Sequence, residues 1–269
     1  MKALVSNIKF YLRLYFCLLG FNFQSRLAYR GEFILSLVSV STELTVRLVF
    51  LSVVYSYIPS LAGWTYPQML LLFASSFILE AIAWFTWRAS IFKLHLVVQD
   101  GSFDFLMTKP VSLLFITAFR RMDLEDVARV VVGVALLMFS FHLSGIFPSV
   151  NQWLLWMVGI SLAQVVYFSF SLMLKTTSFW TTQTSEINYV MYSLDRLNQY
   201  PTHLYTGFVR FLFTFIIPVT FISTLPAQFL TGTASWLGLL GLAGFAGLIF
   251  LLARWVFYTS IKAYSSASS

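Results

Sequence analysis

Six apolar windows, separated by polar or charged connections, run along this chain. Each window has at least about 17 residues, which is the length that a helix needs to cross a hydrocarbon core of about 30 Å. The pattern therefore predicts an all-α membrane protein with six transmembrane helices. The windows cover residues 33–58, 67–87, 127–147, 153–174, 208–225 and 236–258.

The charged residues are distributed unevenly between the connections. The short connections 59–66, 148–152 and 226–235 contain no charged residue. Of the 17 Lys and Arg residues, all but Arg47 fall in the N-terminal segment, in or next to the long connections, or near the C-terminus. Lys and Arg are enriched on the cytoplasmic side of membrane proteins. We therefore expect both termini and both long loops, residues 88–126 and 175–207, to lie in the cytoplasm.

The composition is typical of a single membrane domain over residues 1–269. The chain is 59% hydrophobic and 10% charged, whereas soluble proteins are about 25% charged. Its net charge of +7 lies in segments next to the membrane, where lipid headgroups rather than nucleic acid are the expected partner. The single cysteine, Cys17, excludes an internal disulfide and a cysteine-based metal cluster.

Residues 1–30 are basic and aromatic and contain an apolar run that is too short to span. They lack the cleavage site of a signal peptide, and Arg26 and Arg30 follow the run. At helical periodicity Lys2, Lys9 and Arg13 share one stripe. We interpret the segment as an interfacial helix in the headgroup plane, with its basic stripe facing lipid phosphates. A frayed cytoplasmic tail is the alternative.

The first long loop, residues 88–126, has the pattern of an organised segment. Residues 88–99 are amphipathic at helical spacing, and the Asp100-Gly101 pair signals a turn after them. A second short amphipathic stretch ends at Pro110, and the apolar residues 111–119 fit the membrane interface. Such a loop suits the docking of a cytoplasmic partner, and a membrane-surface loop without a partner fits the pattern equally well.

Three charged residues lie well inside the first two apolar windows, whereas Arg129, Arg210 and Arg254 lie close to the ends of later windows. Glu43 and Arg47 are four residues apart, so that they share a helix face and can pair, and Glu80 can complete a triad with Arg47. One hypothesis is a neutralised pair that joins the first two spans. The other is that the carboxylates face a translocation path and attract a cationic amphiphile, helped by aromatic rings. Pro218 is expected to kink the fifth window.

The chain carries no motif of an enzyme. It has no Gly-x-x-x-x-Gly-Lys-Ser/Thr loop for ATP phosphates, no His-Glu-x-x-His metal motif and no Gly-x-Ser-x-Gly nucleophile motif. We therefore expect no catalytic residue, no metal and no cofactor on this chain. Any ATP-driven function then requires a separate partner that binds ATP.

Several short motifs occur in an order that carries a family resemblance. Residues 101–111 read Gly-Ser-Phe-Asp-Phe-Leu-Met-Thr-Lys-Pro-Val, and the later motifs are Tyr200-Pro201, Arg210, Ile216-Ile217-Pro218 and Leu225-Pro226-Ala227. Together with the amphipathic N-terminus and the six windows, they cover nearly the whole chain. The chain resembles permease subunits of type-2 ABC exporters, in the six-span subfamily that includes viologen-exporter-like systems.

The resemblance implies a permease of the bacterial cytoplasmic (inner) membrane that exports a hydrophobic or amphiphilic small molecule, such as a drug in multidrug efflux, a lipid or a metabolite. ATP and Mg would bind to a separate ABC ATPase subunit in two copies. A second permease subunit, identical or related, would complete the transporter. The alternatives are an ATP-independent secondary transporter and a membrane scaffold or assembly protein, neither of which needs a stoichiometric ATPase.

The resemblance also implies that a coupling helix in the first long loop seats in a groove of the ATPase. Aromatic and Arg side chains in such a loop are typical interface hot spots. The residues that take this role by resemblance are Arg88, Phe92, Leu94, Gly101, Phe103, Asp104, Phe105, Lys109 and Pro110.

Overall fold

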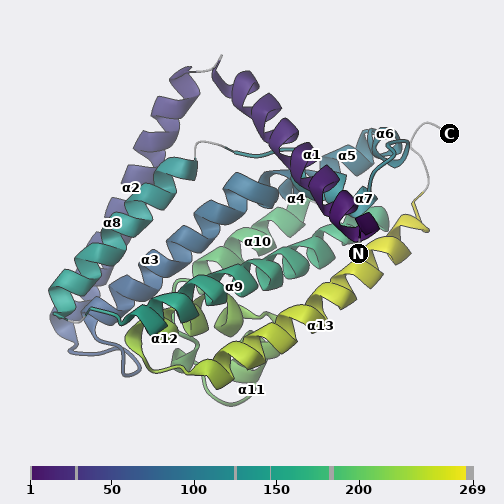
Figure 1. Cartoon of the computed structure of the whole chain (residues 1–269). Helices are drawn as coiled ribbons and strands as arrows, with labels where there is room; N and C mark the ends of the chain where they lie inside the picture. Colours follow the sequence, from purple (N-terminus) through teal and green to yellow (C-terminus); the bar gives the residue numbers. More distant parts are fainter. Residues whose placement is uncertain (1, 28–29, 124–125, 146, 182–184, 265–269) are drawn as a thin grey trace.

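The computed structural model describes the backbone of residues 2–27, 30–123, 126–145, 147–181 and 185–264. Within these ranges the chain forms helices and turns, and no strand is present (Figure 1). Five of the helical segments are long and apolar enough to cross a membrane. The prediction of an all-α membrane protein is therefore confirmed. The five segments are the part Val38–Tyr57 of α2 (Arg30–Tyr57), the run Tyr66–Gln99 that begins with α3 (Tyr66–Ala83), α8 (Val127–Ser144), the run Val150–Phe179 that begins with α9 (Val150–Thr176), and α13 (Trp236–Ile261).

The short uncharged connections start two of these helices with side-chain caps. At the start of α3 the side chain of Gln68 accepts a hydrogen bond from the backbone N–H of Thr65 over 3.0 Å. At the start of α9 the Ser149 hydroxyl accepts from the backbone N–H of Gln152, whose side chain accepts in return from the N–H of Ser149. These reciprocal bonds satisfy backbone donors that a helix start otherwise leaves unpaired. We call this end of the bundle the turn end.

The run that starts with α3 lies at the centre of the bundle. Its side chains Leu70 and Leu72 pack with Leu137 of α8, and Leu79 belongs to a second buried cluster with α9 and α13. A Cβ atom on Gly133 of α8 would lie only 2.6 Å from Cγ1 of Ile78. The absence of a side chain at this glycine therefore allows α3 and α8 to approach closely.

The central run extends beyond the second apolar window, which ends at Trp87. It continues through a π-helical turn (Trp84–Arg88), α4 (Ala89–Phe92) and α5 (Leu94–Gln99). The expected loop 88–126 thus begins with eleven helical residues, interrupted by a turn at Lys93, that prolong the span. The reason is that Ile91, Leu94 and Val97 are buried, so that the apolar face of this amphipathic stretch packs on the bundle.

Two shorter helices follow at the end of the bundle opposite to the turn end. They are α6 (Phe103–Met107) and α7 (Leu113–Phe119). The ring of Phe103 lies 4.9 Å from that of Phe179, just after α9, and 5.4 Å from that of Tyr264, just after α13. We call this end of the bundle the α6 end; Figure 1 shows α5, α6 and α7 there.

The helix α1 (Lys2–Leu27) runs beside α7 (Figure 1). Tyr11 packs on Phe115 with ring centroids 4.9 Å apart, and Tyr15 packs on Phe119 at 5.6 Å. The Asn22 side chain donates to the carbonyl of Arg120 over 3.2 Å. The N-terminal segment is thus helical as predicted, and its interfacial position stays a prediction.

The fifth apolar window does not form one straight helix. The segments Gly207–Ile216 and Thr220–Thr231 meet at an angle of 70° across the break that holds Pro218. Either this bent pair counts as a sixth span or it forms a re-entrant loop. The prediction of six regular spans is therefore met only in the coarser form of five long helices and one bent pair.

The expected loop 175–207 contains the helix α10 (Ser185–Leu197), which packs within the bundle behind α9 (Figure 1). The carbonyl of Asn198 accepts a hydrogen bond from the Ser76 hydroxyl in the middle of α3 over 3.0 Å. The backbone N–H of Thr202 donates to the Thr224 hydroxyl over 3.2 Å. Between α9 and α13 the chain therefore forms α10 and then the bent pair, and hydrogen bonds attach the segment between them to α3 and to the bent pair. Sequence patterning missed α10 because polar residues interrupt its apolar ones, so that it forms no continuous apolar window.

Candidate functional site

A charged cavity of about 600 Å³ lies between α2, α3, α8 and α10. Most of its lining is polar, although spans α2, α3 and α8 contribute to its walls. Charged groups inside a membrane protein face its interior or a water-filled cavity, because lipid exposure is costly. The acidic lining residues are Glu43, Glu80, Asp123, Asp126 and Asp195, and the basic ones are Arg47, Arg129 and Arg196.

A chain of ion pairs links α2 to the start of α8. Arg47 pairs with Glu43 one turn earlier on α2, as the four-residue spacing predicts. The other carboxylate oxygen of Glu43 lies 3.7 Å from Arg129, whose Nε lies 2.9 Å from Asp126. Arg47 also lies over the ring of Phe73, 5.7 Å from its centroid. These pairs neutralise most of the charge on this wall of the cavity.

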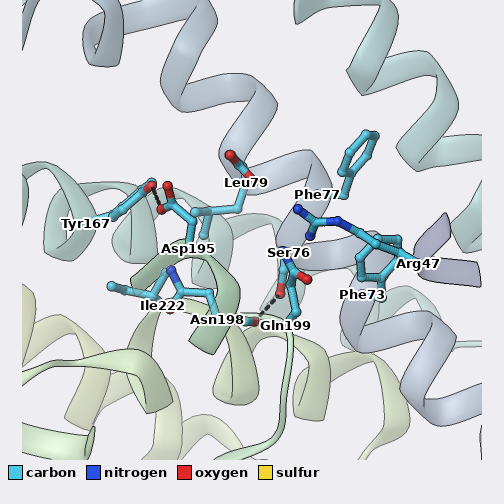
Figure 2. Close-up of a pocket in the computed structure, with 11 residues that line it drawn as sticks. Arg47, Phe73, Ser76, Phe77, Leu79, Tyr167, Asp195, Asn198, Gln199 and Ile222 are labelled. Atoms are coloured by element: carbon cyan, nitrogen blue, oxygen red, sulfur yellow. Dashed lines mark hydrogen bonds between the residues drawn. The ribbon is translucent and has the colours of Figure 1, made fainter. Parts of the chain in front are cut away.

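Glu80 stands apart from this chain of ion pairs. It is half-buried on α3 and lines the same cavity as Arg47, yet no cation in the described part of the chain forms an ion pair with it. The three residues of the expected triad, Glu43, Arg47 and Glu80, therefore line one cavity, but only Glu43 and Arg47 are in direct contact. Figure 2 shows Arg47 directed toward Phe77 and Ser76, on one side of the pocket that Asp195 and Tyr167 close.

Asp195, one of the residues that line the cavity, forms a buried ion pair with Arg88. Nη1 of Arg88 donates to Oδ1 of Asp195 over 3.0 Å, and Nη2 donates to Oδ2. The hydroxyl of Tyr167 on α9 donates to the same Oδ1 (Figure 2). The guanidinium also lies over the rings of Trp84 and Tyr167, 4.9 and 5.0 Å from their centroids. Arg88 is 0% exposed, so in this conformation it has no surface to offer to a partner.

The turn between α5 and α6 is set by Asp100 and Gly101. Gly101 has φ +74°, a conformation that favours glycine. Oδ1 of Asp100 accepts from the hydroxyl and the backbone N–H of Ser102, over 2.6 and 2.9 Å. These hydrogen bonds lower the pKa of the Asp100 carboxyl. The turn thereby reverses the chain and presents α6 at the end of the bundle.

The predicted coupling residues divide into a buried and an exposed set. Phe103 and Leu94 are buried, and Phe92 is half-buried below the Nζ of Lys175, which lies 4.8 Å from the ring centroid. Phe105 is 63% exposed, with Nζ of Lys109 lying 3.7 Å from its ring centroid. Pro110 is also exposed. The surface available to a partner is therefore made by Phe105, Lys109 and Pro110.

Asp104 connects this surface to the C-terminal end of the last span. It is half-buried and interacts with Tyr264, where burial first and the carboxylate second raise the pKa of the tyrosine hydroxyl. Phe103, beside Asp104 on α6, contacts the same Tyr264 ring. A force applied to α6 would therefore reach the ends of α9 and α13 directly.

No group of three or more His, Cys, Asp and Glu side chains in the described ranges is arranged to hold a metal ion. Comparison with known proteins gives one family: a family model described as "ABC-2 family transporter protein" matches residues 42–268. No curated protein and no solved structure matches the chain. The matched range contains the charged cavity, α6 and the buried ion pair, and it leaves α1 outside.

Proposed function

Because the chain belongs to the ABC-2 family of transporters, we propose that it is the permease subunit of an ATP-driven exporter in a bacterial cytoplasmic membrane. The five long apolar helices and the bent pair supply the membrane-spanning part. The α6 end, with both termini, lies on the cytoplasmic side in this proposal, because the connections at the turn end carry no charge.

The observation that carries the proposal is the division of α6 into two faces. Phe105 points outward with Lys109 above its ring, whereas Phe103 is clamped between the residues that follow α9 and α13. An exposed aromatic next to a cation is suited to a pocket on a partner protein. A partner that moves α6 therefore moves two spans with it.

We infer that the partner is an ABC ATPase subunit in two copies, which binds ATP and Mg because this chain has no phosphate-binding loop. A second permease subunit, identical or related, completes the transporter. Phe105, Lys109 and Pro110 make the contact, and the buried coupling residues hold α6 in position for it. Arg88 then supports the cavity rather than the ATPase contact.

The charged cavity is proposed as part of the substrate path, and the substrate as a hydrophobic or amphiphilic molecule. Five acidic and three basic residues line the cavity, which favours a positively charged group. Trp84, Tyr189 and Tyr192 lie among the lining residues and offer rings for cation–π contacts. A cationic amphiphile, such as a drug or a metabolite with an aromatic cation, fits this lining best.

The first test is purification of the tagged full-length chain from its native membrane in mild detergent, followed by mass spectrometry. Near-stoichiometric recovery of an ATPase subunit, with or without a second permease, is the expected result. Recovery of the chain without any ATPase in several detergents would favour a secondary transporter or a scaffold. The matched control is the Phe105→Ala variant, which is expected to lose the ATPase and to keep its own yield.

A further inference from the structure

An apolar groove of about 780 Å³ runs between α1 and the body of the protein. One wall is formed by Tyr11 and Tyr15 of α1 together with Phe115 and Phe119 of α7, which pack on each other. The opposite wall includes Trp87 of the central run. Nearly all of the exposed lining is apolar, and the groove is open along one side. Its size and chemistry suit a hydrocarbon chain.

A basic pocket of about 400 Å³ lies beside this groove. Lys93, Arg120 and Arg121 line it, and Asp123 is the one acidic residue of its described lining. Asp100, outside the pocket, also interacts electrostatically with both arginines. Burial, and then the like charge of Arg121, lower the pKa of Arg120. An anion bound here would relieve the repulsion between the two guanidinium groups.

The groove and the pocket lie in line along three helices. On the central run Ile82 and Thr86 line the groove, and Ala89 and Lys93 line the pocket. These four residues follow one another along the run, the first two before or within the π-helical turn Trp84–Arg88 and the last two after it. The two pocket residues come seven positions after the two groove residues, which places the pocket about 10 Å closer to the α6 end. The apolar lining therefore lies deeper in the bundle than the basic lining.

The other two helices repeat this order. On α7 Phe115 and Phe119 line the groove, and Arg120, which follows directly, lines the pocket. On α1 Tyr15 lines the groove, and Asn22, two turns later, lines the pocket. Asn22 is fixed there, because it donates to the carbonyl of Arg120 and accepts from the N–H of Met122 over 3.4 Å. The same three helices thus line an apolar groove for a hydrocarbon chain and, next to it, a basic pocket for a phosphate.

We propose that the groove and the basic pocket together bind one anionic phospholipid from the leaflet at the α6 end. One acyl chain lies against Tyr15, Phe119 and Trp87, and the phosphate lies between Arg120, Arg121 and Lys93. The surplus of two positive charges among the lining residues of the pocket (three basic and one acidic) selects an anionic over a zwitterionic headgroup. The lipid would hold α1 against α7, next to α6, which makes the proposed contact with the ATPase.

The experiment compares lipid binding to the delipidated full-length protein by native mass spectrometry. The probes are dioleoyl phosphatidylglycerol, dioleoyl phosphatidylcholine with the same chains, and glycerol phosphate without a chain. The headgroup variant is Arg120→Gln with Arg121→Gln. Its matched control is Lys9→Gln with Arg13→Gln, which removes the same charge from exposed positions of α1 outside both cavities. A third variant, Ser161→Phe, fills the groove without changing charge.

The wild type is expected to bind phosphatidylglycerol at least about ten-fold more tightly than phosphatidylcholine, and glycerol phosphate more weakly than either. The headgroup variant should lose this preference, the control variant should keep it, and Ser161→Phe should weaken both lipids. Equal binding of the two lipids by the wild type, or equal losses in both charge variants, would overturn the proposal. Glycerol phosphate binding as tightly as the lipid would exclude the groove. If the double variant does not stay monodisperse, Lys93→Gln replaces it as the headgroup variant and should reduce the preference for phosphatidylglycerol. Ser161→Phe still tests the groove.

Discussion

The guanidinium of Arg88 and the carboxylate of Asp195, 107 residues apart in the chain, form a two-pronged ion pair inside the bundle. Arg88 is at the end of the π-helical turn in the central run, and Asp195 is in the last turn of α10. The pair therefore joins the central run to the helix that starts the return path. Because Tyr167 of α9 also donates to Asp195, three elements meet at one carboxylate.

Removing one partner of this pair should destabilise the protein strongly. Asp195→Ala leaves a buried guanidinium without its counter-ion, and breaking a buried pair in this way costs about 3–5 kcal/mol. We expect a large fall in the unfolding temperature, measured by tryptophan fluorescence in detergent. The double variant Arg88→Met with Asp195→Leu removes both charges and should recover much of the loss. A double variant as unstable as the single one would show that the pair is not the source of the effect.

Much of the fold follows from patterning, since long apolar windows and uncharged connections locate the ends of the long helices. The caps at Thr65 and Ser149 have the polar residues that such positions favour. The continuation of the second span past Trp87 is less visible, because Arg88 breaks the apolar pattern. Its charge is balanced by Asp195, and no local signal indicates a partner so far away in the chain.

The candidate site was predicted only in part for the same physical reason. Glu43 and Arg47 pair within one helix, so their spacing alone predicts the contact. Asp195 and Arg129 reach the cavity from other helices, and their contribution depends on tertiary packing. The helix that carries Asp195 has low average hydrophobicity because it lines the polar cavity, so a search for apolar windows passes over it.

The two faces of α6 predict opposite effects for two phenylalanines. Phe105→Ala should leave the unfolding temperature unchanged and weaken ATPase binding by about thirty-fold, since a hot-spot side chain contributes about 2 kcal/mol or more. Phe103→Ala should instead destabilise the protein by about 3–5 kcal/mol, as for other buried aromatics. The measurements are thermal unfolding and titration with the purified ATPase. Met107→Ala, at a 42% exposed position of the same helix, is the control for binding.

Charge reversal at the same element tests coupling rather than binding alone. Asp104→Lys with Lys109→Asp should separate ATP hydrolysis from transport, because it alters the contact with Tyr264 and the cation above Phe105. The expected result in proteoliposomes is continued ATPase activity with little export. Transport at the wild-type level in this double variant would remove α6 from the mechanism.

The position of Glu80 predicts a charge-selective effect on transport. Glu80→Gln removes one negative charge from the cavity without breaking a described ion pair. Export of a fluorescent aromatic cation should fall by about ten-fold, which corresponds to about 1.4 kcal/mol of lost attraction. Export of a neutral dye of similar size should stay unchanged and serves as the control. An equal fall for both dyes would mean that Glu80 supports the structure rather than the selection of substrate.

The same substitution at two glycines should change stability in opposite directions. Replacing glycine by alanine inside a helix stabilises it by up to about 1 kcal/mol when the new methyl group has room. At Gly241 of α13 a Cβ meets nothing within 4 Å, whereas at Gly133 of α8 it would lie 2.6 Å from Cγ1 of Ile78. Gly241→Ala should therefore raise the unfolding temperature slightly. Gly133→Ala should lower it, because overpacking typically costs about 1–3 kcal/mol. A rise at both positions would contradict the close packing of α3 on α8, and a fall at both would indicate that α13 has a close neighbour in the assembled transporter.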